Sequence, residues 1–351
     1  MMDLIDLVKH GVDYKASDIH ITVGIPPVFR IDGSLVYFGE NILYPENTKA
    51  LVQQVLDMRE LEELEQNGEL DTSYSSSGIG RFRINAYKQR GSYGMAIRII
   101  PLRIPTMDKL GLPNIVKELA MLPRGLILVT GPTGSGKSTT LASMVNLINE
   151  EKNCHILTLE DPIEYLHKHN KSIVNQREIG SDTNSFSNAL RAALRQDPDV
   201  ILVGEMRDLD TMSIALTAAE TGHLVLSTLH TVGAAKTIDR IIDVFPPHQQ
   251  QQVRVQFSSV IQAIISQQLL PKSNGNGRVA AFEIMVATPA IRNLIREEKI
   301  HQIDTSIQTG GKQGMQTMDS SLLELYNNGI ISKDTILNQA INLHIIRRYV
   351  L

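Results

Sequence analysis

The segment Gly131–Ser138 (GPTGSGKS) constrains the fold of this chain more than any other feature. It fits the pattern G-x-x-x-x-G-K-[ST], in which glycines let successive backbone N–H groups turn toward an anion. The apolar run Gly125–Thr130 precedes it, and Ser138–Glu151, a stretch of helical character, follows it. The positive end of that helix would point at the same anion. The sequence therefore predicts a phosphate-binding loop between a buried strand and a helix.

The pattern also predicts a task for individual residues of the loop. Lys137 would reach the β- and γ-phosphates of a nucleotide, and the Ser138 hydroxyl would complete the coordination shell of Mg²⁺. ATP and Mg²⁺ are therefore the expected cofactors. The predicted nucleotide-binding residues are Gly131, Pro132, Thr133, Gly134, Ser135, Gly136, Lys137, Ser138 and Thr139.

Four short apolar runs after Arg124 indicate the fold class. Helical or mixed-polar stretches separate most of them, and continuous apolar strands covered by helices are typical of a parallel sheet buried on both faces. An α/β core is therefore expected. After Pro247 the sequence predicts mostly helix, with one more strand-like pair near Val279–Ile284. The four predicted strands are Gly125–Thr130, His155–Glu160, Val200–Glu205 and His223–Thr228.

The first hundred residues have a different pattern. Helical stretches are interspersed with short runs in which apolar and polar residues alternate. The alternating runs predict an antiparallel or mixed sheet. The segment Ser73–Gly80 (SYSSSGIG) is predicted to be a turn. The predicted helical stretches are Met2–His10 and Pro45–Asn67, and the predicted strands are Asp18–Val23, Val28–Ile31, Arg81–Tyr87 and Tyr93–Ile99.

Residues 101–113 differ from the flanking sequence because three prolines and a glycine interrupt them, a composition that suits an extended linker. The sequence therefore predicts a smaller α+β domain over residues 1–100, a linker over 101–113, and an α/β domain with a helical carboxyl-terminal part over 114–351.

Polar residues follow each predicted strand of the α/β domain. In such sheets, ligands bind beyond the carboxyl ends of the strands. The second strand leads into Glu160–Glu164, the third into Gly204–Asp208 and the fourth into Thr228–Thr231. One edge of the sheet would thus gather the phosphate loop, carboxylates and an imidazole, which favours hydrolysis of ATP.

Roles can be assigned within this set. Glu205 is best placed to hold Mg²⁺ together with Ser138, and a helix-capping or salt-bridging carboxylate is the alternative. Glu164 is the predicted residue that orients or deprotonates the attacking water, with Glu160 as the second candidate. His230 lies at the phosphate end and could report occupancy of the γ-phosphate, or it could be structural.

Other polar side chains have simpler interpretations. Asp208 and Asp210 stand where an N-cap would precede the predicted helix Thr211–Thr221. His167 and His169 have no acidic or cysteine partners at useful spacing, so solvated loop residues are predicted.

Composition excludes several classes of protein. Lys and Arg total 34 against 38 Asp and Glu, a net charge of −4 that does not favour binding to nucleic acid. A single cysteine, Cys154, excludes an internal disulfide and a cysteine-ligated zinc cluster. No apolar run approaches the ~18 residues of a membrane span. Asp3 and Asp6 stand where a secretion signal would be basic, so a cytoplasmic location is expected.

Six segments together resemble four signatures of one family. Lys15–His20, Gly24–Pro27 and Arg30–Gly33 are similar to its opening signature, Thr158–Tyr165 to its aspartate box, Asp197–Asp208 to its atypical Walker B, and Thr217–Thr231 to its histidine box. The family is the secretion ATPases of type II secretion and type IV pili.

Two further features resemble the pilus retraction ATPases within it. Ala290–Glu297 (AIRNLIRE) is similar to a segment that these carry near the carboxyl end. By itself it predicts an amphipathic helix with Ile291, Leu294 and Ile295 on one face. Extension ATPases usually carry a tetracysteine zinc motif, which one cysteine cannot supply.

The resemblance implies a RecA-like P-loop NTPase core and a PAS-like amino-terminal domain. It also implies a homo-hexamer that drives pilus retraction, located peripherally at the cytoplasmic face of the inner membrane and coupled to a membrane platform protein. It further implies Glu164 as catalytic carboxylate, Glu205 as the Walker-B residue and His230 as the nucleotide-proximal histidine. Arg83 and Arg98 would approach the γ-phosphate, with Arg81 as a further candidate.

Alternatives remain open at this point. A pilus-extension or type II secretion ATPase would share the same chemistry. Two other functions remain possible: a nucleic-acid translocase of RecA-like fold, and a regulator that binds ATP but barely hydrolyses it.

Overall fold

The chain divides into two compact units in a computed structural model that describes residues 3–31, 33–76, 78–100, 103–275 and 277–350. The amino-terminal unit ends at Arg103 and includes Glu164–Leu166, and the carboxyl-terminal unit comprises the rest from Ile104 onward. Some residues used in the predictions lie outside the described residues, namely Met2 in the first helix, Asp32, Ser77, and Pro101 and Leu102 at the start of the predicted linker.

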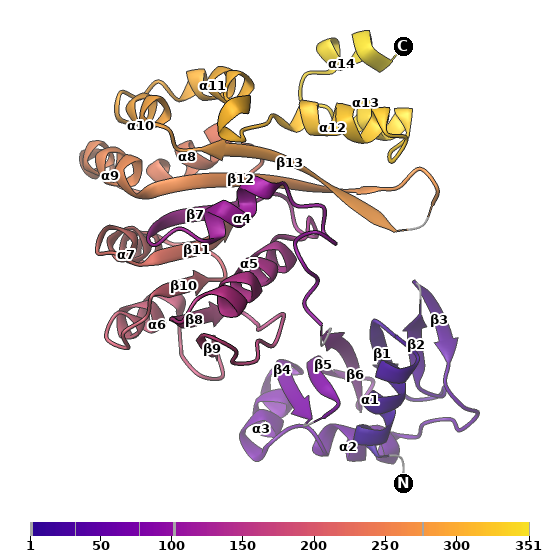
Figure 1. The fold of residues 1–351 in the computed structure, drawn as a ribbon. Helices are drawn as coiled ribbons and strands as arrows, with labels where there is room; N and C mark the ends of the chain where they lie inside the picture. Colours follow the sequence, from indigo (N-terminus) through magenta and orange to yellow (C-terminus); the bar gives the residue numbers. More distant parts are fainter. Residues whose placement is uncertain (1–2, 32, 77, 101–102, 276, 351) are drawn as a thin grey trace. The chain divides into compact units, whose positions relative to one another are not determined.

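The amino-terminal unit is a six-stranded antiparallel sheet in the order β3-β2-β1-β6-β5-β4 (Figure 1). Buried residues of three helices, such as Leu7, Val52 and Leu64, form one core with strand residues such as Ile19 and Phe82. The elements are α1 (Leu4–Asp13), β1 (Asp18–Ile21), β2 (Val28–Ile31), β3 (Ser34–Tyr37), α2 (Pro45–Gln53), α3 (Met58–Asn67), β4 (Glu69–Ser76), β5 (Gly80–Gln89) and β6 (Ser92–Ile100).

Two predictions for this unit were wrong in detail. The helical stretch predicted over Pro45–Asn67 is two helices, because Asp57 begins α3 as an N-cap whose side chain accepts a hydrogen bond from the Glu60 N–H. Ser73–Ser76 lie in β4 rather than in a turn. Their hydroxyl-rich sequence carries little strand signal, and the pairing of β4 with β5 along its whole length determines the conformation.

The carboxyl-terminal unit is built on a seven-stranded sheet in the order β13-β12-β7-β11-β10-β8-β9 (Figure 1). Neighbouring strands are parallel except β12 and β13, which are antiparallel. The strands are β7 (Gly125–Thr130), β8 (His155–Glu160), β9 (Ile173–Glu178), β10 (Val200–Val203), β11 (Leu224–Leu229), β12 (Ile261–Pro271) and β13 (Arg278–Val286).

Helices cover this sheet and continue to the carboxyl end. They are α4 (Asn114–Ala120), α5 (Lys137–Glu151), α6 (Phe186–Ala193), α7 (Leu209–Glu220), α8 (Ala234–Asp243), α9 (Pro247–Val260), α10 (Pro289–Arg296), α11 (Ile303–Thr309), α12 (Met318–Asn327), α13 (Lys333–Gln339) and α14 (Leu343–Val350). Among the described residues, no helix combines the length and apolar character needed to cross a membrane.

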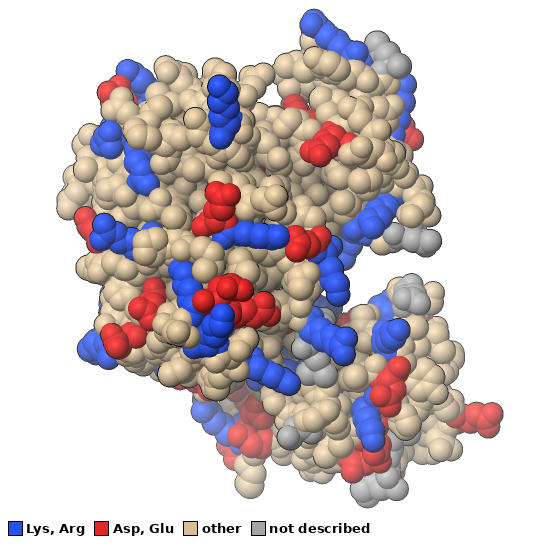
Figure 2. Space-filling model, viewed as in Figure 1, with Lys and Arg blue, Asp and Glu red and all other residues tan. Residues whose placement is uncertain are grey.

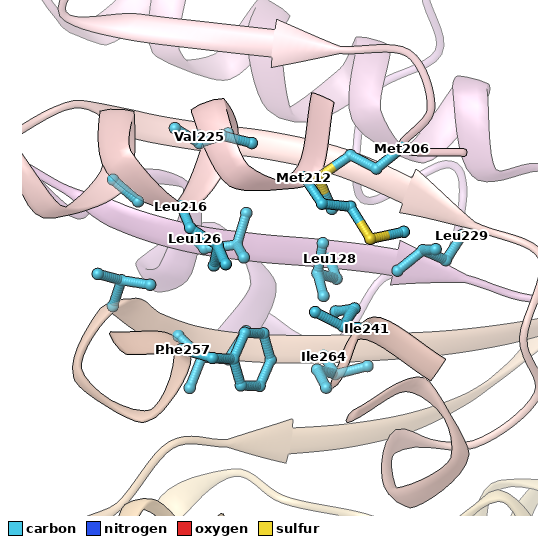
Figure 3. Packing of buried hydrophobic residues seen from close by; sticks show 14 of the residues in the cluster. Leu126, Leu128, Met206, Met212, Leu216, Val225, Leu229, Ile241, Phe257 and Ile264 are labelled. Atoms are coloured by element: carbon cyan, nitrogen blue, oxygen red, sulfur yellow. The ribbon is translucent and has the colours of Figure 1, made fainter. Parts of the chain in front are cut away.

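Alternate residues of the central strands are buried in two separate cores, one on each face of the sheet, because successive side chains of a strand point to opposite faces. Leu126 and Leu128 pack with α6 to α11 on one face, where Figure 3 shows them beside Phe257 and Ile264. Ile127 and Val129 pack with α4 and α5 on the other face. Burial on both faces explains why these strands are continuously apolar. Because the strands are parallel, their carboxyl ends lie at the same edge of the sheet.

The prediction for this unit missed two strands. The strands β7 and β8 have the predicted bounds, but β9 and β12 were not predicted, and β12 lies where mostly helix was expected. The run Ile261–Pro271 has no regular period, and an apolar run of that kind does not distinguish a buried strand from a buried helix. Pairing with β7 on one side and β13 on the other makes it a strand.

Candidate active site

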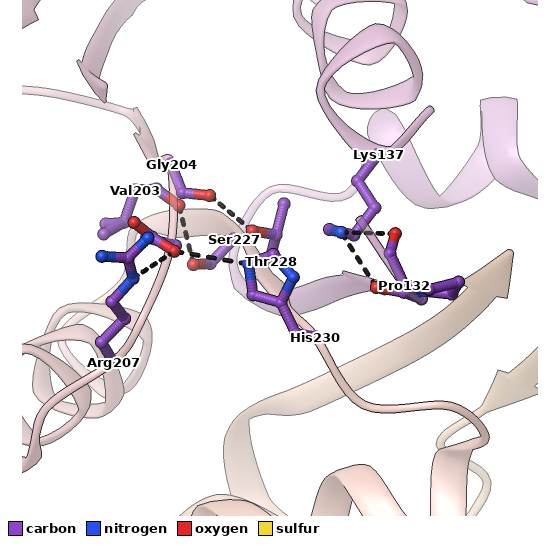
Figure 4. A network of polar contacts seen from close by, with 10 residues as sticks. Pro132, Lys137, Val203, Gly204, Arg207, Ser227, Thr228 and His230 are labelled. Atoms are coloured by element: carbon purple, nitrogen blue, oxygen red, sulfur yellow. Dashed lines mark hydrogen bonds and ion pairs between the residues drawn. The ribbon is translucent and has the colours of Figure 1, made fainter. Parts of the chain in front are cut away.

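The phosphate loop occupies the turn between β7 and α5, and Lys137 is the first residue of the helix. Gly131, Gly134 and Gly136 have φ angles of 141°, 79° and 91°, a region that side chains other than glycine rarely adopt. The Lys137 Nζ donates hydrogen bonds to the carbonyl oxygens of Gly131, at 2.9 Å, and Pro132, at 3.1 Å (Figure 4). The ammonium group is therefore held inside the loop.

Two polar groups of the loop are buried at an energetic cost. Burial lowers the pKa of Lys137 below its ordinary value of 10.5, and the Glu205 carboxylate offsets part of that effect. The Ser135 Oγ is buried and has no hydrogen-bond partner among the described residues. A buried ammonium and an unpaired buried hydroxyl are both groups that an anion would stabilise, so the loop fits a phosphate chain.

Glu205 follows β10, and the side chains of Arg207 and His230 contact its carboxylate. Its Oε2 lies 2.6 Å from the Arg207 Nε and 3.5 Å from the His230 Nε2. The Glu205 side chain is 12% exposed, whereas the His230 side chain is 50% exposed. Glu205 is thus a largely buried acceptor, and the His230 side chain beside it is half exposed.

Hydrogen bonds between neighbouring strand ends fix the backbone before Glu205. The Gly204 N–H donates to the Leu159 carbonyl at 2.8 Å, and the Thr228 Oγ1 donates to the Gly204 carbonyl at 2.6 Å. A Cβ at Gly204 would lie 3.2 Å from the Leu159 oxygen, which is a tight contact. This close approach explains why a glycine separates the apolar strand from Glu205.

The segment after His230 is also anchored. The Gly233 N–H donates to the Ser266 Oγ of β12 at 2.9 Å, and the Ala234 N–H donates to Glu283 of β13 at 2.7 Å. Burial raises the pKa of Glu283, and its hydrogen bond from Ala234 partly opposes that shift. The antiparallel hairpin therefore holds the loop that carries His230.

The structure places the predicted site residues in two groups. The phosphate loop, Glu205 and His230 lie together in the carboxyl-terminal unit. Glu164 belongs to the segment grouped with the amino-terminal unit. Arg83 and Arg98 also belong to that unit, where they are directly opposite each other on β5 and β6. The Arg98 Nε lies 3.0 Å from the Asp18 Oδ1, so a carboxylate already neutralises part of its charge.

Other predicted residues have defined structural roles. The Glu160 Oε1 accepts hydrogen bonds from the Thr158 hydroxyl at 2.6 Å and from the Gln176 amide at 3.2 Å. The predicted N-cap Asp208 is confirmed, because its side chain accepts from the Thr211 N–H at 2.8 Å. Asp210 lies in the first turn of α7 instead of at its cap.

The prediction of a solvated His167 was wrong. Its Nδ1 is buried with no hydrogen-bond partner among the described residues, and burial lowers the pKa of His167 to about 4. His169 instead accepts a hydrogen bond at its Nδ1 from the Val174 N–H, at 3.0 Å. The His169 contact depends on β9, which contains Val174 and which the sequence analysis missed.

Two further residues of the site were also missed. Glu178, on β9, accepts a hydrogen bond from the Ile163 N–H, the residue before Glu164, at 2.9 Å. Gln267, on β12, contacts the phosphate loop through its side-chain amide. The polar trio Ser266–Gln268, between the apolar residues Ala263–Ile265 and Leu269–Leu270, is the sequence signal that could have found Gln267.

A metal at this site would depend on few protein ligands. Within the described ranges, no group of three or more His, Cys, Asp or Glu side chains is arranged to hold a metal ion. An exposed Ser138 and the nearby Glu205 offer one hydroxyl and one carboxylate. This donor set fits Mg²⁺ bound mainly by phosphates and water, which is how protein sites with one or two ligands hold it.

Comparison with known proteins defines the class. The family model described as "Type II/IV secretion system protein" matches residues 2–338, and the chain belongs to this family, which confirms the resemblance noted from its motifs. The chain is 50% identical to the type IV pilus retraction ATPase PilT of Pseudomonas aeruginosa, over 97% of this chain and 98% of PilT. It is also 50% identical to the twitching motility protein of Neisseria gonorrhoeae, over 90% of this chain and 84% of that protein.

The fold is also similar to that of a solved structure from the same class of ATPases. The crystal structure of the pilus retraction motor PilT with bound ADP matches with a TM-score of 0.93 and 50% identity, covering 99% of this chain and all of that one. The predicted fold class, a RecA-like P-loop core with a smaller α+β domain, is confirmed.

Proposed function

We propose that this chain is a Mg²⁺-dependent ATPase that works as a homo-hexameric motor and drives type IV pilus retraction. The observation that carries the proposal is the meeting of the phosphate loop, Glu205 and His230 at one edge of the sheet, in a chain half identical to two retraction and twitching proteins. We infer that the protein acts in the cytoplasm, at the inner membrane, through a pilus platform protein.

The proposed chemistry assigns a role to each residue. The loop residues Gly131–Thr139 bind the phosphates. Ser138 and Glu205 hold Mg²⁺, which neutralises charge on the phosphates when bound. Glu164 accepts a proton from the attacking water as the bond between the γ-phosphorus and the bridging oxygen breaks, leaving ADP and phosphate.

The remaining predicted residues would link chemistry to movement. His230 contacts Glu205 and is half exposed, so it is suited to report phosphate occupancy to a neighbouring subunit or domain. Arg83 and Arg98 would neutralise the γ-phosphate, because a planar guanidinium matches phosphoryl oxygens. Residues 101–113 would form the hinge between domains of residues 1–100 and 114–351, since a few loop positions absorb such motions.

A Glu164→Gln variant tests the proposal against a regulator that binds ATP without hydrolysing it. We expect ATP affinity near that of the wild type and turnover reduced by about 100-fold or more, the usual contribution of a general base. Unchanged turnover in this variant would support the regulator and contradict the assignment of Glu164.

A nucleic-acid translocase is less well supported. Figure 2 shows Lys and Arg interspersed with Asp and Glu over the viewed face of the carboxyl-terminal unit, and the net charge is −4. Strong stimulation of turnover by single-stranded nucleic acid, with a steep dependence on salt, would favour the translocase.

A further inference from the structure

Gln267 lies in the second half of β12 and is 3% exposed. Its side-chain amide joins two parts of the nucleotide-binding segment. The Nε2 donates a hydrogen bond to the Ser135 carbonyl inside the loop, and the Oε1 accepts one from the Thr140 hydroxyl in the first turn of α5, at 2.8 Å. One buried side chain from a distant strand therefore bridges the loop and the helix that follows it.

The loop has glycines at the two positions that Gln267 approaches. A Cβ at Gly136, where φ is +91°, would lie 2.8 Å from the Gln267 Nε2. A Cβ at Gly131 would collide with the backbone carbonyl of Gln267. These glycines therefore do more than allow an unusual backbone conformation. They also make room for β12 to contact the loop.

The hydrogen bond to Ser135 has a consequence for the next N–H group. A trans peptide is planar, so its C=O and N–H point in opposite directions. Because Gln267 holds the Ser135 carbonyl on the β12 side, the Gly136 N–H points away from β12. Backbone N–H groups that point inward are what such a loop uses to bind an anion.

We propose that Gln267 is the positioning residue of the phosphate loop, and that it orients the Ser135–Gly136 peptide for binding the phosphates beyond the α-phosphate of a nucleotide. The inference rests on the proposed function, since it assigns how that site is held in its binding conformation. Gln267 acts through the loop and is not itself a catalytic residue.

The test compares ADP affinity with the stability of the nucleotide-free protein. In Gln267→Leu, we expect the Kd for ADP to rise by about tenfold or more, because a buried hydrogen bond to the loop is lost and the Ser135 carbonyl is left unpaired. The Kd for AMP, which lacks the β-phosphate, should stay unchanged. A residue with only a structural role would lower the melting temperature without this difference between ADP and AMP.

Gln268→Leu is the matched control on the same strand. The Gln268 Oε1 is buried and has no hydrogen-bond partner among the described residues, and the side chain points to the opposite face of the sheet from Gln267. ADP affinity should therefore equal that of the wild type in this variant.

A second variant covers the case in which Gln267→Leu does not fold. Gln267→Glu keeps nearly the same shape and can still accept from Thr140, but it places an oxygen against the Ser135 carbonyl. It should show the same selective loss of ADP affinity. Folded Gln267→Glu protein that binds ADP within about twofold of the wild type would overturn the proposal.

These results are distinguishable from failure of the proposed function. Wild-type protein that binds ADP but leaves ATP intact would contradict the proposed function, and the comparison of ADP affinities would still decide the role of Gln267.

Discussion

Lys137 is the residue at which binding and stability are most directly opposed. Its ammonium is buried, and burial lowers its pKa, so the charged form costs free energy in the folded protein. For a lysine with a lowered pKa, this cost is present at pH values below the folded-state pKa. It disappears as the pH rises above the unfolded value of 10.5.

A Lys137→Met variant should therefore lose nucleotide binding without losing stability. We expect the melting temperature of the nucleotide-free protein to fall by no more than about 2 °C at neutral pH. ADP should raise the melting temperature of the wild type but not that of the variant, because only a protein that binds ADP gains stability from it. A large loss of stability without nucleotide would show that the ammonium is a structural group.

His167 gives the protein a predictable dependence on acid. Because its pKa is lowered from 6.5 to about 4, the unfolded chain takes up a proton before the folded one does as the pH falls. Stability should therefore decrease between about pH 6.5 and pH 4, by up to about 3 kcal/mol from this group.

Urea unfolding of wild type and His167→Gln at pH 7 and pH 4.5 measures this contribution. The wild type should lose about 2 kcal/mol more than the variant between the two conditions. Equal losses would mean that the pKa of His167 is not lowered in the folded protein.

Site residues could be predicted from the sequence where the pattern that marks them lies in neighbouring residues of the chain. The loop glycines and Lys137 form a contiguous motif, and Glu205 and His230 follow apolar strands, so all of them could be found. Gln267 and Glu178 could not be assigned a role, because their contacts depend on β12 and β9, which pair with strands far away in the chain.

At the scale of elements, α10 shows how a recognised segment is held in place. Ile291 and Ile295 are buried and Leu294 packs beside them, as the amphipathic pattern predicted. Arg292 donates hydrogen bonds to the Ser258 carbonyl at 2.6 Å and the Ser259 carbonyl at 2.7 Å, near the end of α9. Its guanidinium therefore supplies donors to carbonyls that the helix end leaves unpaired.

Arg292→Lys should weaken this junction, because one ammonium cannot reproduce the planar set of donors. We expect a loss of about 1–3 kcal/mol in unfolding free energy, measured with urea. Arg296→Lys, one turn later on the exposed side, is the control and should change stability by no more than about 0.5 kcal/mol. Equal effects in the two variants would contradict the capping role.

The elements themselves were predictable where burial is uniform. Strands β7 and β8 are apolar along their length and have the predicted bounds. Strand β4 is rich in serine and threonine, and β9 (IVNQRE) is mostly polar, so neither carries a strong pattern. Their pairing with β5 and β8 determines their structure, and that pairing is a tertiary effect.

At the scale of the whole molecule, the proposed retraction motor and an extension ATPase would share the same chemistry, so their effect on cells is what separates them. Deleting the gene for a retraction motor should leave cells with more pili and no twitching, because pili would still assemble but would not be withdrawn. Counting surface pili and measuring twitching zones tests this outcome. Cells without pili would instead identify an extension ATPase.

The central claim is that ATP is cleaved where the phosphate loop, Glu205 and His230 meet, in an assembly of several subunits. The most direct measurement is phosphate release from ATP by the purified protein, with and without magnesium, alongside the mass of the assembly, for wild type and Lys137→Ala. We predict magnesium-dependent turnover by a hexamer, and no turnover by the variant. Wild-type protein that leaves ATP intact in the presence of magnesium, or equal turnover by both proteins, would contradict the claim.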